Sequence, residues 1–250
     1  MRYNPSEPAV FFPLLEGFSC GYSMIVQIYG AKTIEDAAAL AALGVDYIGL
    51  DVADDPADRA LMKQIVDLVR DRMITVLLPV FCDIATGLRI VKEIKPHVMH
   101  LCSTDMLSVA ELRAVKKELG EIKLLQAIPV GLPGRSDKTD SLGLAREYQE
   151  VADIFILDTY AGDYSEGSTE VPGMIGITGK VHDWAISRKI VAQSRKPVIL
   201  AGGLNPENVA AAIKAVQPWG VDSCTGTDIC RGKKDLAKVQ AFVNAAKSFE

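Results

Sequence analysis

The sequence has no paired cysteine motif and no long apolar run. Its five cysteines are scattered and odd in number, without a Cys-x-x-Cys pair: Cys20, Cys82, Cys102, Cys224 and Cys230. This pattern argues against a disulfide framework and a zinc site, and it favours the reducing cytoplasm. No apolar run approaches the roughly 20 residues needed to span a bilayer, so we expect no membrane segment.

The chain also lacks a strong excess of one charge. Its formal net charge is −5 over 250 residues, and both signs are mixed along the sequence. This balance argues against a surface that binds nucleic acid or another polyanion. Apolar residues make up 49% of the chain, which is enough for a sizeable core.

The N-terminal residues differ from the rest. Residues 1–23 contain a short apolar stretch that is broken by Pro13 and preceded by one basic residue, which is a poor signal peptide. We interpret residues 1–23 as an N-terminal extension that packs on the body of the fold or on a partner subunit. No linker divides residues 24–250, which we expect to form one domain.

Strand-like stretches alternate with helix-like stretches along this domain. The strands are expected at Met24–Tyr29, Asp46–Val52, Ile74–Phe81, His97–Leu101, Ile122–Val130, Asp153–Asp158, Pro197–Ala201 and Gly220–Ser223. Such alternation predicts a parallel sheet. Because there are eight strands and the chain has the usual length, we predict a closed (β/α)8 TIM barrel rather than a doubly wound open sheet.

Two glycine-containing turns follow the last two expected strands. Gly202-Gly203 follows the seventh strand, and Thr225-Gly226 follows the eighth. Asn205 suits a helix N-cap and Pro206 suits a first helical position. Free backbone N–H groups beside a helix N-terminus bind anions, and phosphate often lies after strands seven and eight of such barrels. The two turns therefore predict one shared phosphate pocket.

Several stretches together resemble the phosphoribosylanthranilate isomerase family of tryptophan biosynthesis. They are PVILAGGLNPENV (197–209), GVDSCTGTD (220–228), GITGKVHDW (176–184), Leu157-Asp158-Thr159 and the opening Ile25–Gly30. The similarity runs from about Met24 to the C-terminus. Each piece alone is a weak signal, whereas the combination is specific.

The resemblance implies a barrel that works without a metal or an organic cofactor. The family opens a phosphoribosyl amine and converts the aldose to a ketose, an Amadori rearrangement. The resemblance implies that Asp158 is the general acid for the ring oxygen, and that Gly202, Gly203, Thr225 and Gly226 hold the phosphate. The partner would be a small phosphorylated sugar-derived substrate, bound by a monomer or a homodimer.

This chain departs from the family at the base. The family's cysteine at the end of strand one is Tyr29 here. A phenol has a pKa of about 10 and a thiol about 8.5, so the phenolate is roughly thirtyfold rarer at neutral pH. Tyr29 can act as a base only if a cation or hydrogen bonds lower its pKa strongly. The family's arginine for the anthranilate carboxylate is also out of place, because Arg59 lies about one residue off register.

Three functions remain open on the sequence. The first is a phosphoribosylanthranilate isomerase-like enzyme with Asp158 and Tyr29 as catalytic residues. The second is a different isomerase, epimerase or lyase, in which Tyr29 donates a hydrogen bond to an oxyanion. The third is a non-catalytic barrel that binds phosphorylated metabolites and has lost its base. Cys102 and Cys224 also lie at strand ends, where either could supply a thiol, although a small buried cysteine is the commoner case. We expect His182 to cap or pack.

Overall fold

The structure is a computed structural model that describes residues 24–103, 105–135, 139–161, 175–176 and 178–249. The strands of its barrel are β1 (Ile25–Tyr29), β2 (Tyr47–Val52), β3 (Ile74–Pro79), β4 (Val98–Leu101), β5 (Lys123–Gly131), β6 (Ile154–Tyr160), β7 (Val198–Leu200) and β8 (Gly220–Ser223). The helices are α1 (Ile34–Ala42), α2 (Pro56–Val69), α3 (Ile84–Ile94), α4 (Val109–Leu119), α5 (Ser141–Tyr148), α6 (Trp184–Gln193), α7 (Val209–Val216) and α8 (Leu236–Lys247).

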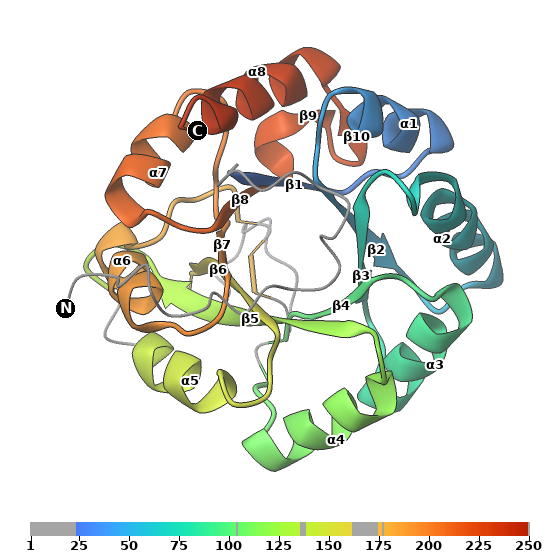
Figure 1. The fold of residues 1–250 in the computed structure, drawn as a ribbon, viewed down its shortest axis with the longest axis horizontal. Coiled ribbons are helices and arrows are strands. Elements are labelled where there is room, and N and C mark those ends of the chain that lie inside the picture. The colour runs from blue at the N-terminus through green and yellow to red at the C-terminus, as the bar shows by residue number, and fades with distance from the viewer. Residues whose placement is uncertain (1–23, 104, 136–138, 162–174, 177, 250) are drawn as a thin grey trace.

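Within the described residues, these strands form one closed parallel barrel. Each strand pairs with the next in the chain, and β8 pairs with β1 through registers such as Val26 with Val221. The helices surround the barrel as an outer ring (Figure 1). The predicted (β/α)8 barrel is therefore confirmed. The proposed N-terminal extension, residues 1–23, lies outside the described residues.

Polar side chains begin most of the helices. The following residues occupy N-cap positions and accept a hydrogen bond from a backbone N–H of the first turn: Thr33, Asp55, Asp83, Ser108, Asp140, Asp183 and Asp235. Such caps satisfy backbone donors that have no partner within the helix. α7 differs, because Asn205 closes the turn ahead of it and the helix itself begins at Val209. Pro206 is therefore in that turn rather than at the first helical position.

A small hairpin between β8 and α8 was not expected from the sequence. A 3-10 turn, η3 (Thr225–Thr227), follows β8 and leads into β9 (Asp228–Cys230), which pairs antiparallel with β10 (Lys233–Lys234). Gly232 turns the chain between these two short strands with a φ of 80°. The hairpin positions Lys234 beneath the turn that follows β8.

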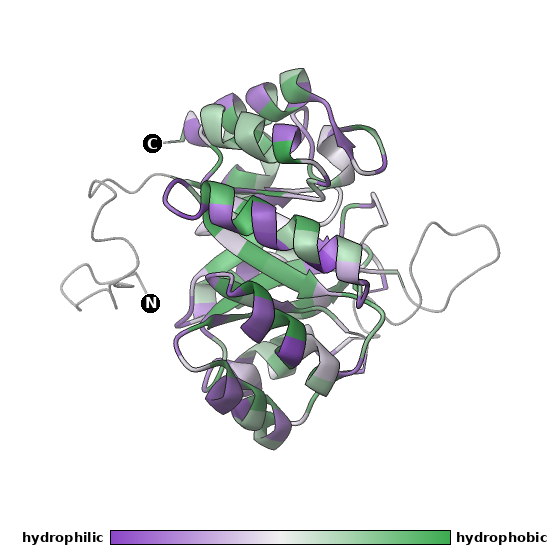
Figure 2. Ribbon diagram, turned by 90° about the vertical axis from the view of Figure 1, so that its right-hand side faces the viewer, coloured by the Kyte–Doolittle hydropathy of each residue, from purple (hydrophilic) through white to green (hydrophobic). Residues whose placement is uncertain are grey.

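The core has two layers because neighbouring strand residues point to opposite faces. Ile28, Phe155 and Phe242 belong to the layer between the barrel and its helices. Tyr29 and Ile156 belong to the barrel interior. The strands accordingly carry buried apolar residues on both faces. Figure 2 shows that the strands are mostly hydrophobic along their length.

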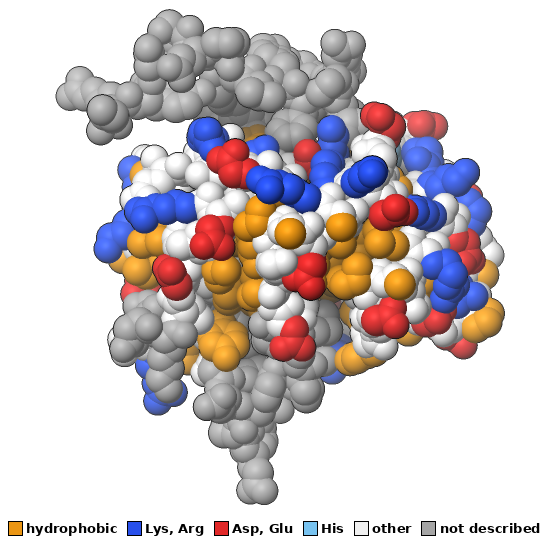
Figure 3. All heavy atoms as spheres, turned by 90° about the horizontal axis from the view of Figure 1, so that it is seen from below, with side chains coloured by type: hydrophobic (Ala, Val, Ile, Leu, Met, Phe, Trp, Pro, Cys, Tyr) orange, Lys and Arg blue, Asp and Glu red, His pale blue; other side chains and the backbone are white. Residues whose placement is uncertain are grey.

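The outer surface carries both charges. Figure 3 shows basic and acidic side chains interspersed on one face, around apolar side chains of the helices. None of the helices in the described part of the chain has both the length and the apolar character needed to cross a membrane.

Candidate active site

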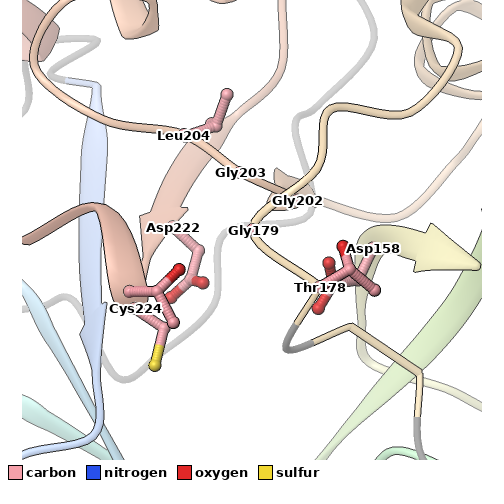
Figure 4. A pocket seen from close by; sticks show the side chains of 9 residues that line it. Asp158, Thr178, Gly179, Gly202, Gly203, Leu204, Asp222 and Cys224 are labelled. Atoms are coloured by element: carbon pink, nitrogen blue, oxygen red, sulfur yellow. The ribbon is translucent and has the colours of Figure 1, made fainter. Parts of the chain in front are cut away.

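A polar pocket opens at the carboxyl ends of β6, β7 and β8 (Figure 4). Its empty space, with the solvent at its mouth included, is about 330 Å³. It is lined by Asp158, Thr178, Gly179, Gly202, Gly203, Leu204, Asp222, Cys224 and Thr225. The carboxyl ends of the strands are where (β/α)8 barrels carry their active sites.

The two glycine turns lie against each other at one side of this pocket. A Cβ atom on Gly226 would lie 2.1 Å from the carbonyl oxygen of Leu204, so only glycine allows this approach. The hydroxyl of Ser223 donates to the same oxygen at 2.8 Å. The structure therefore brings together the turns after β7 and β8, as the sequence predicted.

The turn after β7 depends on backbone conformations that favour glycine. Gly202 has a φ of 81° and Gly203 a φ of 63°, both in the left-handed region. A Cβ on Gly202 would also meet the Thr159 hydroxyl at 2.4 Å, and one on Gly203 would meet the Lys180 carbonyl carbon at 2.7 Å. The Gly202-Gly203 turn consequently has no room for a side chain at either position.

Backbone donors of these turns are available to a ligand. Within the described residues, no hydrogen bond is recorded from the amides of Gly202, Gly203, Thr225 or Gly226. Gly202, Gly203 and Thr225 line the pocket, whereas Gly226 packs behind it against Leu204. Unpartnered amides grouped in a glycine turn form a concave site for an anion.

A buried ion pair supports the turn after β8. The ammonium of Lys234, whose side chain is fully buried, donates to the carbonyl oxygen of Cys224 at 3.1 Å and to the Asp228 carboxylate at 2.6 Å. Lys234 thereby ties the hairpin to the residue that precedes Thr225.

Asp158 lies near the end of β6, with its carboxylate at the pocket. One oxygen accepts a hydrogen bond from the Thr159 N–H at 2.7 Å. The other lies against Gly176, where a Cβ would come within 2.0 Å of it. Burial raises the pKa of Asp158 to about 6, against the opposing effect of the Thr159 hydrogen bond. The carboxyl is thus suited to giving up a proton near neutral pH.

A second carboxyl, Asp222 on β8, faces the same pocket and was not singled out from the sequence. Figure 4 shows Asp158 and Asp222 on opposite sides of the pocket. Asp222 is buried, and one of its oxygens accepts a hydrogen bond from the Gln27 amide at 3.0 Å. Burial raises its pKa to about 7; the negative charge of Asp158 adds to the rise, while Gln27 and Lys234 oppose it.

Tyr29 is held inside the barrel by a buried histidine. Its hydroxyl lies 2.7 Å from Nδ1 of His100, and the two rings meet edge to face with centroids 5.6 Å apart. Its ring lies over Gly49, where a Cβ would be only 2.2 Å from Cδ2 of the tyrosine. Burial, followed by the negative charge of Asp222, raises the pKa of Tyr29 well above its usual value. The phenol is therefore neutral across the physiological range.

The cysteine thiols at the strand ends are protonated, and the nearby His182 is buried and hydrogen-bonded. Burial raises the pKa of both Cys102 and Cys224 to about 12. The Cys102 thiol also donates to the Ile175 carbonyl oxygen at 3.1 Å. His182 lies 2.8 Å from the Ser187 hydroxyl, and burial lowers its pKa to about 4. His182 is therefore a packed residue, as expected.

Two basic residues in the segments that follow β1 and β2 form ion pairs with carboxylates. Arg59 forms ion pairs with Asp54 and, at 3.2 Å, with Glu93. Lys32 pairs with Asp51 at 2.5 Å. Arg59 is thus held by neighbouring carboxylates in the first turn of α2. Among the described residues, no group of three or more His, Cys, Asp or Glu side chains could hold a metal ion.

Comparison with known proteins identifies the family. The family model described as N-(5'-phosphoribosyl)anthranilate (PRA) isomerase matches residues 26–245. The N-(5'-phosphoribosyl)anthranilate isomerase of Methanocella arvoryzae is 34% identical over 231 residues, which are 89% of this chain and 97% of that relative. The isomerase 2 of Methanosarcina mazei is 36% identical over 230 residues, covering 90% of this chain and 95% of that one.

Solved structures agree on the fold. The phosphoribosyl anthranilate isomerase of Thermotoga maritima superposes with a TM-score of 0.69 at 23% identity, covering 90% of this chain and 99% of that one. A phosphoribosyl anthranilate isomerase in complex with reduced 1-(o-carboxyphenylamino)-1-deoxyribulose 5-phosphate superposes with a TM-score of 0.67 at 21% identity, covering 90% and 99%. The family is one of aldose–ketose isomerases, so the other two functions left open by the sequence are not favoured. This chain belongs to the N-(5'-phosphoribosyl)anthranilate isomerase family.

Proposed function

We propose that this protein isomerises N-(5'-phosphoribosyl)anthranilate, with Asp158 as the proton donor and the turns after β7 and β8 as the phosphate site. One observation carries the proposal: a single pocket contains the carboxyl of Asp158, the glycine turn Gly202-Gly203 and Thr225. A phosphorylated sugar held by the turns would extend its ring toward the carboxyl. This arrangement supports a reaction that begins by protonating the ring oxygen.

The phosphate would be bound by backbone rather than by lysine or arginine. Gly202, Gly203 and Thr225 line the pocket, and their amides donate no hydrogen bond to another described residue. Gly226 would contribute its amide from behind, where it packs against Leu204. Backbone amides suit this task because their positions are fixed by the barrel and cost no side-chain ordering on binding.

Asp158 would open the sugar ring as a general acid. Its pKa of about 6 leaves roughly one-tenth of the carboxyl protonated at pH 7, whereas an ordinary aspartate would be protonated about a hundredfold less. Proton donation to the ring oxygen would break its bond to C1' while the lone pair of the amine nitrogen forms a C=N bond. The carboxyl of Asp158 would then be left as the carboxylate.

The surroundings of Tyr29 weigh against it as the proton acceptor. The Asp222 carboxylate and burial both disfavour the phenolate, and the described residues around the hydroxyl provide a neutral imidazole rather than a cation. Tyr29 would instead pack the barrel interior, outside the residues that line the pocket.

The relatives supply the expected ligand class. One structural neighbour was solved with a reduced deoxyribulose 5-phosphate, a phosphorylated open-chain sugar carrying the carboxyphenylamino group. We propose the same class of ligand for this chain. The scattered, odd-numbered cysteines support a cytoplasmic location. The residues that line the pocket come from one chain, so the proposal fits a monomer and a homodimer alike.

A direct assay tests this function. Purified protein is mixed with freshly prepared N-(5'-phosphoribosyl)anthranilate, and the ketose product is separated by chromatography and quantified over time. We expect catalytic turnover, and we expect the gene to restore growth of a tryptophan auxotroph that lacks the isomerase. Absence of product at enzyme concentrations equal to that of the substrate would contradict the proposal.

A further inference from the structure

We infer that Asp222 is the group that removes the proton from C2' of the opened sugar, in place of the cysteine that this chain lacks. This inference rests on the proposed isomerase function. It assigns the role of proton acceptor to a residue that lines the pocket, because Tyr29 is unsuited to that role. Three features of the pocket lead to it.

The first feature is the position of Asp222. It lies on β8, three residues before Thr225 of the proposed phosphate site, and across the pocket from Asp158 (Figure 4). The ribose between a phosphate at the turns and a ring oxygen at Asp158 would therefore pass beside the Asp222 carboxylate. A proton acceptor on the side opposite the donor suits a reaction that adds a proton at one atom and removes one from a neighbouring carbon.

The second feature is the bonding of the Asp222 carboxylate. Gln27 donates to one oxygen and fixes the orientation of the group. The other oxygen accepts no hydrogen bond from the described residues, and Asp222 lines the pocket. One oxygen is thus anchored, and the carboxylate faces the space where a ligand would bind. Gln27 therefore orients the carboxylate and leaves it able to accept a proton.

The third feature is the protonation state of the other possible proton acceptors, Tyr29 and Cys224. The Tyr29 hydroxyl is bonded to His100 and carries a raised pKa. The Cys224 thiol lines the pocket, but its pKa of about 12 leaves only about one thiolate in 10⁵ at pH 7. Asp222, with a pKa of about 7, is half ionised there. Ionisation therefore favours the carboxylate over the thiol by more than four orders of magnitude.

The groups that act on Asp222 come from several elements. Asp158 on β6 opposes its ionisation, whereas Lys234 on β10 and Gln27 on β1 favour it. The productive form of the site has a proton on Asp158 and a negative charge on Asp222.

The proton transfers balance over one turnover. Protonated Asp158 gives its proton to the ring oxygen as the C1'–O bond breaks and the C1'=N bond forms. The Asp222 carboxylate then takes the C2' proton; the C–H electron pair forms C1'=C2', and the C=N electrons return to nitrogen. In the final tautomerisation C1' gains a proton from Asp222 and the C2' hydroxyl loses one to Asp158. Both carboxyls are thereby restored.

The experiment compares Asp222→Asn and Asp222→Ala with a matched control, Asp67→Asn. Asp67 is an exposed carboxylate on α2 that pairs with Lys63. For each protein we would measure kcat between pH 5 and pH 9, add formate to the alanine variant, and titrate the reduced deoxyribulose 5-phosphate analogue to obtain its Kd. Far-UV and near-UV circular dichroism would check that each variant folds.

We expect both Asp222 variants to lose about 10²- to 10⁴-fold in kcat, as for a removed general base. We expect the Kd of the analogue to change by less than about tenfold, the acidic limb of the kcat profile to disappear in Asp222→Asn, and formate to restore part of the activity of Asp222→Ala. Asp67→Asn should match the parent. These readouts separate proton removal from a merely structural role.

Two results would overturn the inference alone. One is a parent enzyme that turns over while Asp222→Asn keeps more than about a tenth of its kcat. The other is a large loss of kcat with an unchanged acidic limb and no response to formate, which would make Asp222 a positioning residue. A parent enzyme with no turnover would instead reject the proposed function, and the inference with it.

Discussion

The Tyr29 hydroxyl and Nδ1 of His100 lie 2.7 Å apart inside the barrel, linking β1 to β4. Both groups are neutral: burial lowers the pKa of His100 to about 3 and raises that of Tyr29 well above 10. The pair shares one hydroxyl proton and provides no charge to the site. Tyr29 therefore contributes packing and one buried hydrogen bond to the barrel interior.

Tyr29→Phe should reduce stability more than activity. Losing the hydroxyl leaves Nδ1 of His100 without its partner, and an unsatisfied buried polar atom costs about 1–3 kcal/mol. We expect kcat to stay within about tenfold of the parent enzyme, because the phenol does not accept the proton. Urea denaturation and steady-state kinetics measure the two effects. A loss of kcat of more than about a hundredfold in a variant of normal stability would instead identify Tyr29 as the general base.

Gly49→Ala should destabilise the barrel because the Tyr29 ring occupies the space of a Cβ. The added atom would lie 2.2 Å from Cδ2 of the ring, and such overpacking costs about 1–3 kcal/mol or more. Gly87→Ala is the matched control: its Cβ would have its nearest neighbour at an ordinary 3.4 Å.

The double variant Tyr29→Ala/Gly49→Ala tests the cause of this cost. We expect the penalty of the alanine at 49 to shrink markedly when the ring is absent, since the two sites are in contact. Thermal unfolding of the four proteins of the cycle gives the coupling. An equal penalty in both backgrounds would show that the ring is not the obstacle.

Lys234→Met should weaken both the fold and the phosphate site. Removing one partner of a buried ion pair costs about 3–5 kcal/mol, because the Asp228 carboxylate stays buried and unpaired. The Cys224 carbonyl also loses its donor, so the turn that carries Thr225 loosens and the KM rises. Lys233→Met, at the exposed neighbouring position of β10, is the control and should stay within about 0.5 kcal/mol. Equal stability of the two variants would contradict this assignment.

Asp222→Asn should be more stable than the parent at alkaline pH. The folded-state pKa of Asp222, about 7, lies above the unfolded value of about 3.9, so folding takes up a proton and stability falls as the pH rises between these values. Asparagine can keep the Gln27 hydrogen bond without the buried charge. We expect a gain on the order of 1–3 kcal/mol at pH 8 and little difference at pH 4, measured by urea denaturation. A variant less stable at pH 8 than at pH 4, relative to the parent, would contradict the raised pKa.

The barrel could be predicted because its signals are local. Apolar runs such as Ile74–Phe81 end at breakers, and capping residues such as Thr33 and Ser108 begin the helices. The turns at Gly202-Gly203 and Thr225-Gly226 were predictable for the same reason, since glycines directly after an apolar run mark a turn, and the loops after the last two strands of such a barrel often bind phosphate.

The carboxyl at Asp222 was harder to find because its importance depends on contacts between distant residues. Its hydrogen bond to Gln27 spans 195 residues of sequence. One signal was present: the alternation along Gly220, Asp222 and Cys224 places Asp222 on the interior face of β8. The hairpin of β9 and β10 was not predicted, because its strands are too short to show an alternating pattern of apolar and polar residues.

The environment of Tyr29 likewise could not be predicted from the sequence. Its ionisation depends on His100, on the space left by Gly49 and on the charge of Asp222, which come from three other strands. The family resemblance suggested that the phenol of Tyr29 stands where a cysteine thiol is expected. The packing around it determines which group can take the proton.

The most direct test of the central claim is the turnover of N-(5'-phosphoribosyl)anthranilate by the parent protein and by Asp158→Asn, measured side by side at pH 7. The account predicts measurable isomerisation by the parent and a loss of about 10²- to 10⁴-fold in kcat for a variant that still folds and binds the reduced product analogue. Equal turnover by the two proteins, or none by the parent, would contradict it.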